Sequence, residues 1–275
     1  AMLKMPSSVT LAGSGRDTIL FLDPKLTVEI NGTAIVNASA DLHDVTIRDL
    51  VIEGATITKR ATSNDPNQDR RQRSYQMAPS RAGIAFLGQT VGQMRNIRLE
   101  HVTVRNCTHN GVAIRGASQV SIINCDISDS GSSVVPGNRL QHNLLLTRVV
   151  GAEVRGGQFD TSPWGSGIEL THSRDVVIEG NEMARNSFHG LRVGDSQNVR
   201  VTNNLVEGND GLGVALHTFA DGSQGIDLRG NIVRYNGAGG ILTGTETKPA
   251  RQDNILTANG GQAPERYAEI PGVAR

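Results

Sequence analysis

One stretch of the sequence nearly repeats itself without a gap. The segment 167–189, GIELTHSRDVVIEGNEMARNSFH, superimposes on the segment 190–212, GLRVGDSQNVRVTNNLVEGNDGL. As a result Gly167, Gly190 and Gly213 lie 23 residues apart. A fixed period of this length is typical of a solenoid, in which each repeat forms one coil and stacks on the next. The repeat therefore constrains the fold before any other feature is considered.

Each repeat contains three short runs of alternating apolar and polar residues. In one repeat these runs are 168–171, 176–179 and 183–184, and Gly, Asn and Asp stand between them. Such alternation predicts strands, and the intervening residues predict turns. We expect triangular coils whose strands lie parallel to their counterparts, ~4.8 Å apart. The first strands of successive coils are expected to begin near Gly83, Gly111, Asn143, Gly167, Gly190, Gly213 and Gly240, and further strands at 45–48 and 50–53.

Asparagines recur at two corners of the predicted coil. Asn181, Asn204 and Asn231 share the first corner, and Asn186, Asn209 and Asn236 share the second. Asparagine tolerates the left-handed backbone conformation, and its amide can bond its neighbours in a stacked ladder. We interpret these residues as structural.

The two cysteines fall on different corners of the coil. Cys125 is at the first corner and Cys107 at the second. Two cysteines are too few for a disulfide framework or a Cys-based zinc site. We expect free, half-buried thiols that occupy ladder positions.

Composition limits the classes of partner. Aromatic residues make up 3% of the chain, so the core must come from Val, Ile and Leu. The 27 basic and 27 acidic residues balance, which disfavours binding to nucleic acid. We find neither an apolar run long enough to span a membrane nor a signal peptide. Residues 1–2, Ala-Met, have the form of a cloning remnant, so a missing leader carries little information about the compartment.

Insertions into the coils predict a groove. Two long insertions, 59–82 and 130–142, both precede a first strand and project from the same corner, whereas the short insertion 220–223 follows a first strand on the opposite side. Insertions of solenoids often border the binding face. We expect a single domain over 1–275, with coils over 7–260 and a tail, 261–275, that packs on the side of the coils or caps their end.

Alternation also predicts which residues of the first strands face the groove. The first and third residues after each leading Gly point inward, and the second and fourth point outward. The outward set comprises Ala113, Arg115, Leu145, Thr147, Glu169, Thr171, Arg192, Gly194, Ala215 and His217. His142, Trp164 and His189 precede the strands, and Tyr75 lies on the long insertion. Arg115, His142, Glu169, His189, Arg192 and His217 are expected to gather over about five adjacent strands, ~20 Å in extent.

These coils resemble the right-handed parallel β-helix of the pectate-lyase superfamily, which includes bacterial polysaccharide lyases and mannuronan C5-epimerases. The opening LKMPSSVTLAGSGRDTILFL, residues 3–22, is similar to the first coils of such enzymes. The resemblance implies an all-β fold, an acidic, uronate-containing polysaccharide as substrate, and a secreted or periplasmic location. The Asp-Pro-His stretch of the epimerases is missing, since Asp23-Pro24 and Asp65-Pro66 are followed by Lys25 and Asn67.

The outward residues favour proton abstraction over hydrolysis. Glycoside hydrolysis uses a carboxylate pair, and only Glu169 projects from the groove floor. β-Elimination and C5-epimerisation both begin when a cation neutralises the uronate carboxylate and a base takes the C5 proton. We assign Arg192 as the neutralising cation, His142 or His189 as the base and Tyr75 as the acid. Substrate-binding residues are predicted to be Arg115, Arg148, Trp164, Glu169, His172 and His217.

Three functions follow from these residues. A polysaccharide lyase is placed first because the epimerase tripeptide is missing, and a uronate C5-epimerase is the alternative. A non-catalytic carbohydrate-binding or surface protein is the third possibility, although rows of exposed aromatic residues are lacking. No cofactor or metal is predicted; calcium stays open, because no spacing typical of a calcium loop occurs. The oligomeric state is left open.

Overall fold

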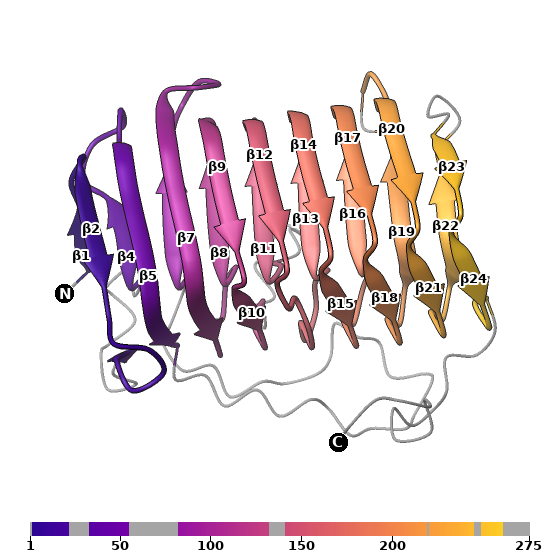
Figure 1. Cartoon of the computed structure of the whole chain (residues 1–275), viewed down its shortest axis with the longest axis horizontal. Helices are drawn as coiled ribbons and strands as arrows, with labels where there is room; N and C mark the ends of the chain where they lie inside the picture. Colours follow the sequence, from indigo (N-terminus) through magenta and orange to yellow (C-terminus); the bar gives the residue numbers. More distant parts are fainter. Residues whose placement is uncertain are drawn as a thin grey trace.

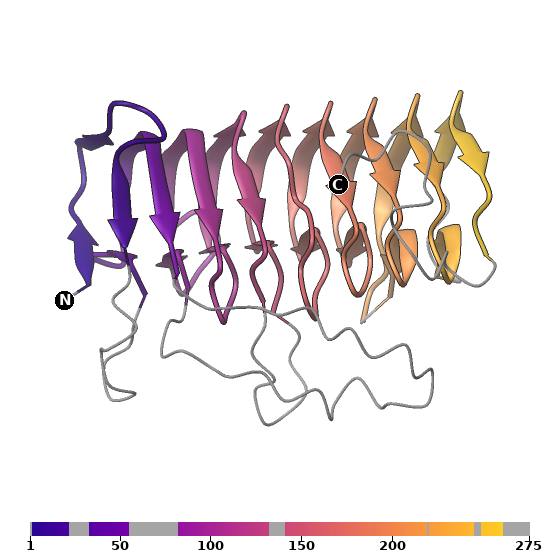
Figure 2. The same cartoon turned by 90° about the horizontal axis from the view of Figure 1, so that it is seen from below.

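The protein is a row of stacked β-coils. The computed structural model describes residues 2–21, 33–54, 82–131, 141–218, 220–244 and 249–260, and within these ranges it contains strands and turns but no helix. Figures 1 and 2 show the coils side by side along the long axis, with β1 and β2 at one end and β22, β23 and β24 at the other. All strand pairings are parallel, and they form three sheets. The all-β parallel fold predicted from the repeat is confirmed.

The first sheet carries the strands that were expected to begin at the repeated glycines. Its order is β1 (Leu3–Met5), β4 (Ile35–Asn37), β6 (Ile84–Leu87), β8 (Val112–Arg115), β11 (Leu144–Thr147), β13 (Ile168–Thr171), β16 (Leu191–Gly194), β19 (Leu212–His217) and β22 (Gly239–Thr243). The coils thus begin at Leu3, before the expected start at residue 7.

The second and third sheets complete each coil. The second contains β2 (Val9–Ala12), β5 (His43–Glu53), β7 (Met94–Arg105), β9 (Ala117–Ile123), β12 (Val150–Arg155), β14 (Arg174–Glu179), β17 (Gln197–Thr202), β20 (Gln224–Arg229) and β23 (Ala250–Gln252). The third contains β15 (Glu182–Ala184), β18 (Leu205–Glu207), β21 (Ile232–Arg234) and β24 (Ile255–Thr257). Outside this order, β3 (Ile19–Phe21) pairs with β5, and β10 (Asp126–Ser128) pairs with β7.

The strands expected separately at 45–48 and 50–53 are one continuous strand, β5. It turns the corner at Asp49, whose φ is 55°, and β7 does the same at His101, with a φ of 51°. Stacked on these two residues in later coils are further left-handed residues, namely Asn124, Gly156, Gly180, Asn203, Gly230 and Asp253. Asn, Asp and Gly adopt this conformation at low cost, which explains why they punctuate the sequence at this place.

The register of the strands places like residues on like. Ile168 pairs with Leu191, which pairs with Val214, and all three are at most 1% exposed. Burying a side chain of this size contributes about 1.5 to 3 kcal/mol relative to leaving it exposed. The aliphatic core predicted from the low aromatic content therefore runs through the coils without interruption.

The asparagine ladders are confirmed at both corners. The main-chain N–H and the amide of Asn181 donate to Oδ1 of Asn204, at 2.9 and 3.1 Å, and Asn204 donates in the same way to Asn231, at 3.0 and 2.9 Å. Asn186, Asn209 and Asn236 repeat this arrangement at the second corner.

Both cysteines are free and occupy corner positions, as expected. The expectation of half-buried thiols is wrong, because Cys107 is 0% and Cys125 is 2% exposed. Their sulfurs lie against main-chain carbonyl groups inside the coil. Burial raises the pKa of each thiol to about 12, so both stay protonated.

The ladder predicts a large stability loss for Asn204→Ala. The substitution removes the acceptor of the Asn181 N–H and of the Asn181 amide, both buried, so the free energy of unfolding should fall by about 2 to 4 kcal/mol. Urea unfolding monitored by circular dichroism measures the change. Gln197→Ala, at an exposed position of β17, is the matched control and should change the value by less than about 0.5 kcal/mol. Equal effects of both substitutions would contradict a stabilising ladder.

Candidate functional site

The outer face of the first sheet presents two rows of side chains across the coils. One row consists of Ala85, Ala113, Leu145, Glu169, Arg192, Ala215 and Leu242, and the other of Leu87, Arg115, Thr147, Thr171, Gly194 and His217. Most members are apolar or small, so the charged residues stand out. The predicted order of the outward residues is that of the structure.

Glu169, Arg192 and His142 form the centre of this outer face, which we call the floor. Nη1 of Arg192 lies 3.3 Å from Oε1 of Glu169, and Nε2 of His142 lies 4.0 Å from Oε2 of the same carboxylate. Glu169 and His142 are each only 4% exposed. The guanidinium of Arg192 also lies over the ring of Phe188, 6.0 Å from its centroid. The structure thus brings together three of the predicted residues.

Burial dominates the electrostatics of this centre. It raises the pKa of Glu169 to about 7, although the Arg192 guanidinium acts in the opposite direction. Burial, followed by the charges of Arg192 and His189, lowers the pKa of His142 to about 3. His142 is therefore neutral at physiological pH, whereas Glu169 changes its charge near neutrality. The Oε2 atom of Glu169 is buried without a hydrogen-bond partner.

His142 and His189 occupy equivalent corners and make the same hydrogen bond. Nδ1 of His142 accepts the N–H of Ser166 at 3.0 Å, and Nδ1 of His189 accepts the N–H of Leu212 at 2.9 Å. In a neutral imidazole the second nitrogen, Nε2, then carries the proton. Each ring is therefore arranged to donate through Nε2 and has no lone pair left to act as a base. Both residues directly precede the leading Asn or Gly of a first strand, which is a signal that can be read in sequence.

Asn110 shows that the corner bond does not require histidine. This residue occupies the equivalent corner of an earlier coil, and its Oδ1 accepts the N–H of His142 at 2.7 Å. An asparagine at position 142 or 189 would therefore keep the main-chain hydrogen bond and remove only the Nε2 proton.

His217 is the exposed histidine of the floor. Its ring centroid is 6.5 Å from that of His189. Partial burial, and secondarily the Arg192 charge, lower the pKa of His217, so the ring is neutral at physiological pH. Unlike the two corner histidines, it lies at the end of its first strand, β19.

Arg115, Arg148 and His172 lie away from this centre. Arg115 is on β8, three strands from Arg192 in the sheet order, and its Nε donates to the carbonyl of Gly88 at 3.0 Å. Arg148 and His172 are exposed residues at the opposite corner, with φ of 54° and 50°. Trp164 is buried, at 8% exposure.

Tyr75 and most of the insertions 59–82 and 130–142 lie outside the described residues, as does the tail 261–275. Their predicted roles as acid, groove wall and cap therefore stay predictions.

The short insertion 220–223 is fastened beside the second row. Oδ2 and Oδ1 of Asp195, directly after β16, accept the N–H groups of Ala220 and Gly222, both at 2.9 Å. Nε2 of His172 lies 3.7 Å from Oδ2 of the same carboxylate. Asp195 therefore serves this loop, which stands at the corner that follows the first strands.

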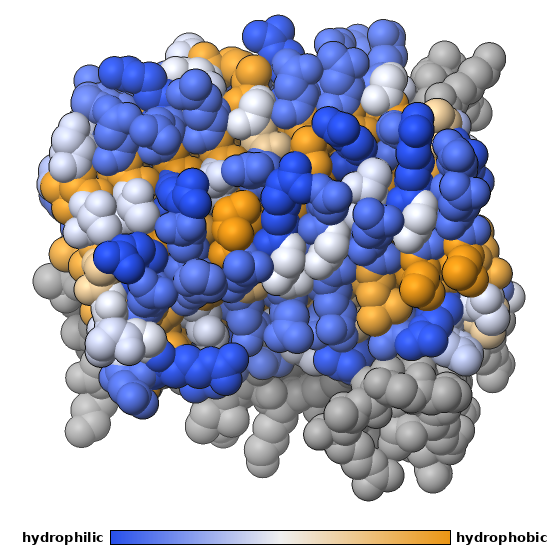
Figure 3. All heavy atoms as spheres, in the orientation of Figure 1, coloured by the Kyte–Doolittle hydropathy of each residue, from blue (hydrophilic) through white to orange (hydrophobic). Residues whose placement is uncertain are grey.

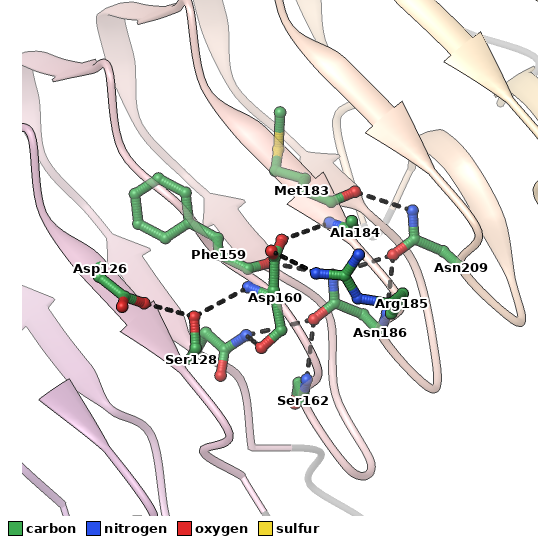
Figure 4. Close-up of polar contacts among 11 residues, drawn as sticks. Asp126, Ser128, Phe159, Asp160, Ser162, Met183, Ala184, Arg185, Asn186 and Asn209 are labelled. Carbon is green, nitrogen blue, oxygen red and sulfur yellow. Dashed lines mark hydrogen bonds and ion pairs between the residues drawn. The ribbon is translucent and has the colours of Figure 1, made fainter. Parts of the chain in front are cut away.

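Asp160 is a buried carboxylate that the sequence did not single out. Figure 4 shows it near the second corner, where Oδ1 accepts the N–H of Ala184 at 2.7 Å and Oδ2 lies 3.0 Å from Nη2 of Arg185. Burial, followed by the nearby Glu182 charge, raises its pKa to about 7. Asp160 takes the place of a main-chain acceptor between two coils. Because it is not part of a repeated pattern, the sequence gives no signal for this role.

The outer face of the second sheet offers a contrast. Figure 3, in the orientation of Figure 1, shows this face as largely hydrophilic. Several of its charges pair within the sheet, as in Arg155 with Glu179, or Arg229 with Asp227 at 2.7 Å. Exposed pairs of this kind contribute about 0 to 1 kcal/mol each. We interpret this face as a solvated surface.

The described part of the chain shows no metal centre. Within it, no group of three or more His, Cys, Asp or Glu side chains is placed to hold a metal ion. In the same residues, no helix is long and apolar enough to cross a bilayer.

The chain belongs to the family described as "Right handed beta helix region", whose model matches residues 35–259. The right-handed parallel β-helix implied by the resemblance is thereby confirmed.

Its similarities to individual proteins reach both enzymes and adhesins. A segment of 92 residues, 32% of this chain, is 35% identical to a mannuronan C5-epimerase of Pseudomonas aeruginosa and covers 17% of that protein. The periplasmic alginate epimerase AlgG, as its D317A mutant, superimposes with a TM-score of 0.59 at 16% identity, over 82% of this chain and 47% of AlgG. The surface adhesin PfbA of Streptococcus pneumoniae superimposes with a TM-score of 0.65 at 10% identity, over 95% of this chain and 87% of PfbA. This chain spans 17% of the length of the Pseudomonas aeruginosa relative and 47% of this AlgG structure, and at these identities the superpositions show the fold alone.

The carboxylate of Asp160 predicts a pH dependence of stability. Its pKa is about 7 in the folded chain against 3.8 for an ordinary aspartate, so folding favours the protonated form. As the pH falls from about 8 to about 5, the wild-type protein should gain about 1 to 3 kcal/mol of unfolding free energy relative to Asp160→Asn, because the variant has no proton to bind. Urea unfolding of both proteins across this range measures the difference. Parallel pH profiles would show that Asp160 titrates normally.

Proposed function

We propose that the outer face of the first sheet is the floor of a groove that binds an acidic, uronate-containing polysaccharide, and that the protein removes the C5 proton of a bound uronate. The observation that carries the proposal is the position of Arg192. It projects from the floor between Glu169 on one neighbouring strand and Ala215 on the other, and Ala215 is two residues before His217. We further propose that the protein works outside the cytoplasm, as periplasmic AlgG and the surface adhesin PfbA do.

Arg192 is suited to neutralise the uronate carboxylate. A proton next to a carboxylate becomes acidic only when the negative charge that develops on the carboxylate is stabilised. The guanidinium is always charged and has five N–H donors in a planar fork, so it can contact Glu169 and a substrate carboxylate together. Because Glu169 holds it from the floor, little reorganisation is needed when the substrate binds.

The proton acceptor that fits the floor best is His217. The ring is exposed and neutral at physiological pH, as a general base requires. His142 and His189, which the sequence favoured as bases, accept main-chain N–H groups through Nδ1 and are better suited to donate through Nε2. We therefore propose that these two rings hold substrate oxygens.

Two reactions can follow removal of the C5 proton. In β-elimination the C5–H electrons form a C4–C5 double bond, the C4–O bond breaks with its electron pair leaving on oxygen, and an acid protonates that oxygen. In epimerisation the same electrons take a proton back at C5 from the opposite face. We propose elimination as the primary reaction, because the Asp-Pro-His stretch is missing.

Epimerisation is the second candidate, and a specific observation favours it. The curated relative that matches 92 residues of this chain at 35% identity is a mannuronan C5-epimerase. A purely adhesive role is a third candidate, favoured by the superposition on PfbA. A binding surface alone has no need of a buried carboxylate beside an arginine, so we place the enzymatic functions ahead of it.

Incubation with alginate and with polygalacturonate distinguishes these candidates. Elimination produces an unsaturated uronate that absorbs in the ultraviolet. Epimerisation produces no such absorbance but exchanges the C5 hydrogen with deuterated solvent, which proton NMR detects. Binding without either signal on both polymers would favour the adhesive role, and absence of binding to both would refute the proposed function.

Variants of the floor should change turnover in a graded way. Arg192→Lys loses the planar fork and should reduce turnover about 10²-fold, whereas Arg200→Lys, on the exposed face of β17, should leave it unchanged. His217→Gln should reduce turnover about 10² to 10⁴-fold at unchanged thermal stability. His142→Asn and His189→Asn keep the corner hydrogen bond, so they test the earlier assignment of a base without loss of fold. If either abolishes turnover while His217→Gln does not, His217 is not the base.

A further inference from the structure

We propose that binding of a uronate carboxylate to Arg192 is coupled to the uptake of one proton by Glu169. This inference rests on the proposed function, since it concerns the same groove. It adds a role for Glu169 as a proton-carrying partner of the bound sugar, where the sequence indicated only a substrate contact.

The geometry leaves Glu169 with one strong partner. Oε1 lies 3.3 Å from Nη1 of Arg192, whereas Oε2 is buried without a hydrogen bond and lies 4.0 Å from Nε2 of His142. An ionised carboxylate that is 4% exposed and only half hydrogen-bonded costs more free energy than a protonated one. Arg192 is therefore the group that keeps Glu169 ionised.

A uronate on Arg192 would place a second carboxylate next to the first. Two carboxylates that share a site cannot both stay ionised at little cost, because their like charges repel at short range. The substrate carboxylate would also draw part of the guanidinium's attraction away from Glu169. Both effects favour protonation of Glu169, the buried member of the pair. Near pH 7 it needs little further shift, since its pKa is already about 7 in the free protein.

Three histidines are further titratable groups near Arg192 in the described part of the chain. His142 faces Glu169 from the corner before β11, and the Arg192 charge acts on both His142 and His217. His189 lies beside His217, with ring centroids 6.5 Å apart. Binding of an anion would favour protonation of these rings too. His142 is far from titrating near neutrality, because its pKa is about 3. His217 could take up the proton instead of Glu169, so the experiment must distinguish proton uptake by these two residues.

The coupling would make recognition of the polysaccharide pH-dependent. A proton taken up on binding means that affinity rises as the pH falls towards the value at which Glu169 is already protonated. The bound complex would then hold a neutral carboxyl group beside the sugar. It would be a hydrogen-bond donor that the free protein at higher pH does not have.

Calorimetry measures the proton directly. Intact protein is titrated with oligomannuronate and with oligogalacturonate of defined length in two buffers of different ionisation enthalpy, HEPES and Tris at the higher pH and acetate and MES at the lower pH. The difference in binding enthalpy gives the number of protons taken up. At about pH 8 the wild-type protein should take up close to one proton, and at about pH 5.5 close to none, because Glu169 is then protonated before binding.

Two variants assign the proton. Glu169→Gln, which resembles the protonated side chain, should still bind the oligosaccharide but with almost no proton uptake and with a flat pH profile of affinity. His217→Gln should retain the uptake. Binding without uptake in the wild-type protein, or full uptake in Glu169→Gln, would overturn the inference and leave the proposed function standing. Failure of both oligosaccharides to bind the wild-type protein would instead refute the proposed function and this inference with it.

Discussion

The interaction on which the rest of the structure depends is the hydrogen bond between equivalent positions of neighbouring coils. Main-chain groups of the strands supply most of these bonds, and at the corners, where strands end, asparagine amides supply them. Asn204 illustrates the economy of the arrangement: it accepts from Asn181, donates to Asn231 and also donates to the carbonyl of Ile178, all within the buried interior. Buried polar groups must be satisfied, and these amides satisfy them at the corners. The chain can therefore turn sharply there without opening the core.

The arrangement of the outward-facing side chains depends on the same stacking. Glu169 and Arg192 are neighbours because their strands pair in register, and His142 and His189 are held because their Nδ1 atoms serve the main chain of the next coil. A repeat that fixes the positions of core residues also fixes the positions of the residues facing out. Functional side chains can therefore be substituted on the floor while the backbone beneath them stays the same.

The sequence predicts the coils well because periodicity, alternation and corner residues all indicate the same fold. It also predicts which residues of each first strand face outward, since alternation has one solution once the glycines are aligned. It could not predict the protonation of those residues. The pKa values of Glu169 and His142 depend on burial by segments distant in sequence, and the roles of the corner histidines depend on a single hydrogen bond of Nδ1. Asp160 escaped notice because it acts once, outside the repeat.

The spacing along the ladders has a consequence for how such a protein can change over evolution. Asn181 and Asn204 are 23 residues apart, whereas Asn204 and Asn231 are 27 apart, yet the amide bonds between them are alike, at 3.1 and 2.9 Å. The extra residues lie in the corner that contains Ala220 and Gly222, where Asp195 binds them. Added residues are thus accommodated at the corners, and the pairing of the strands does not change. New loops can be acquired one coil at a time, so the surroundings of the first sheet can be reshaped while the scaffold is inherited intact.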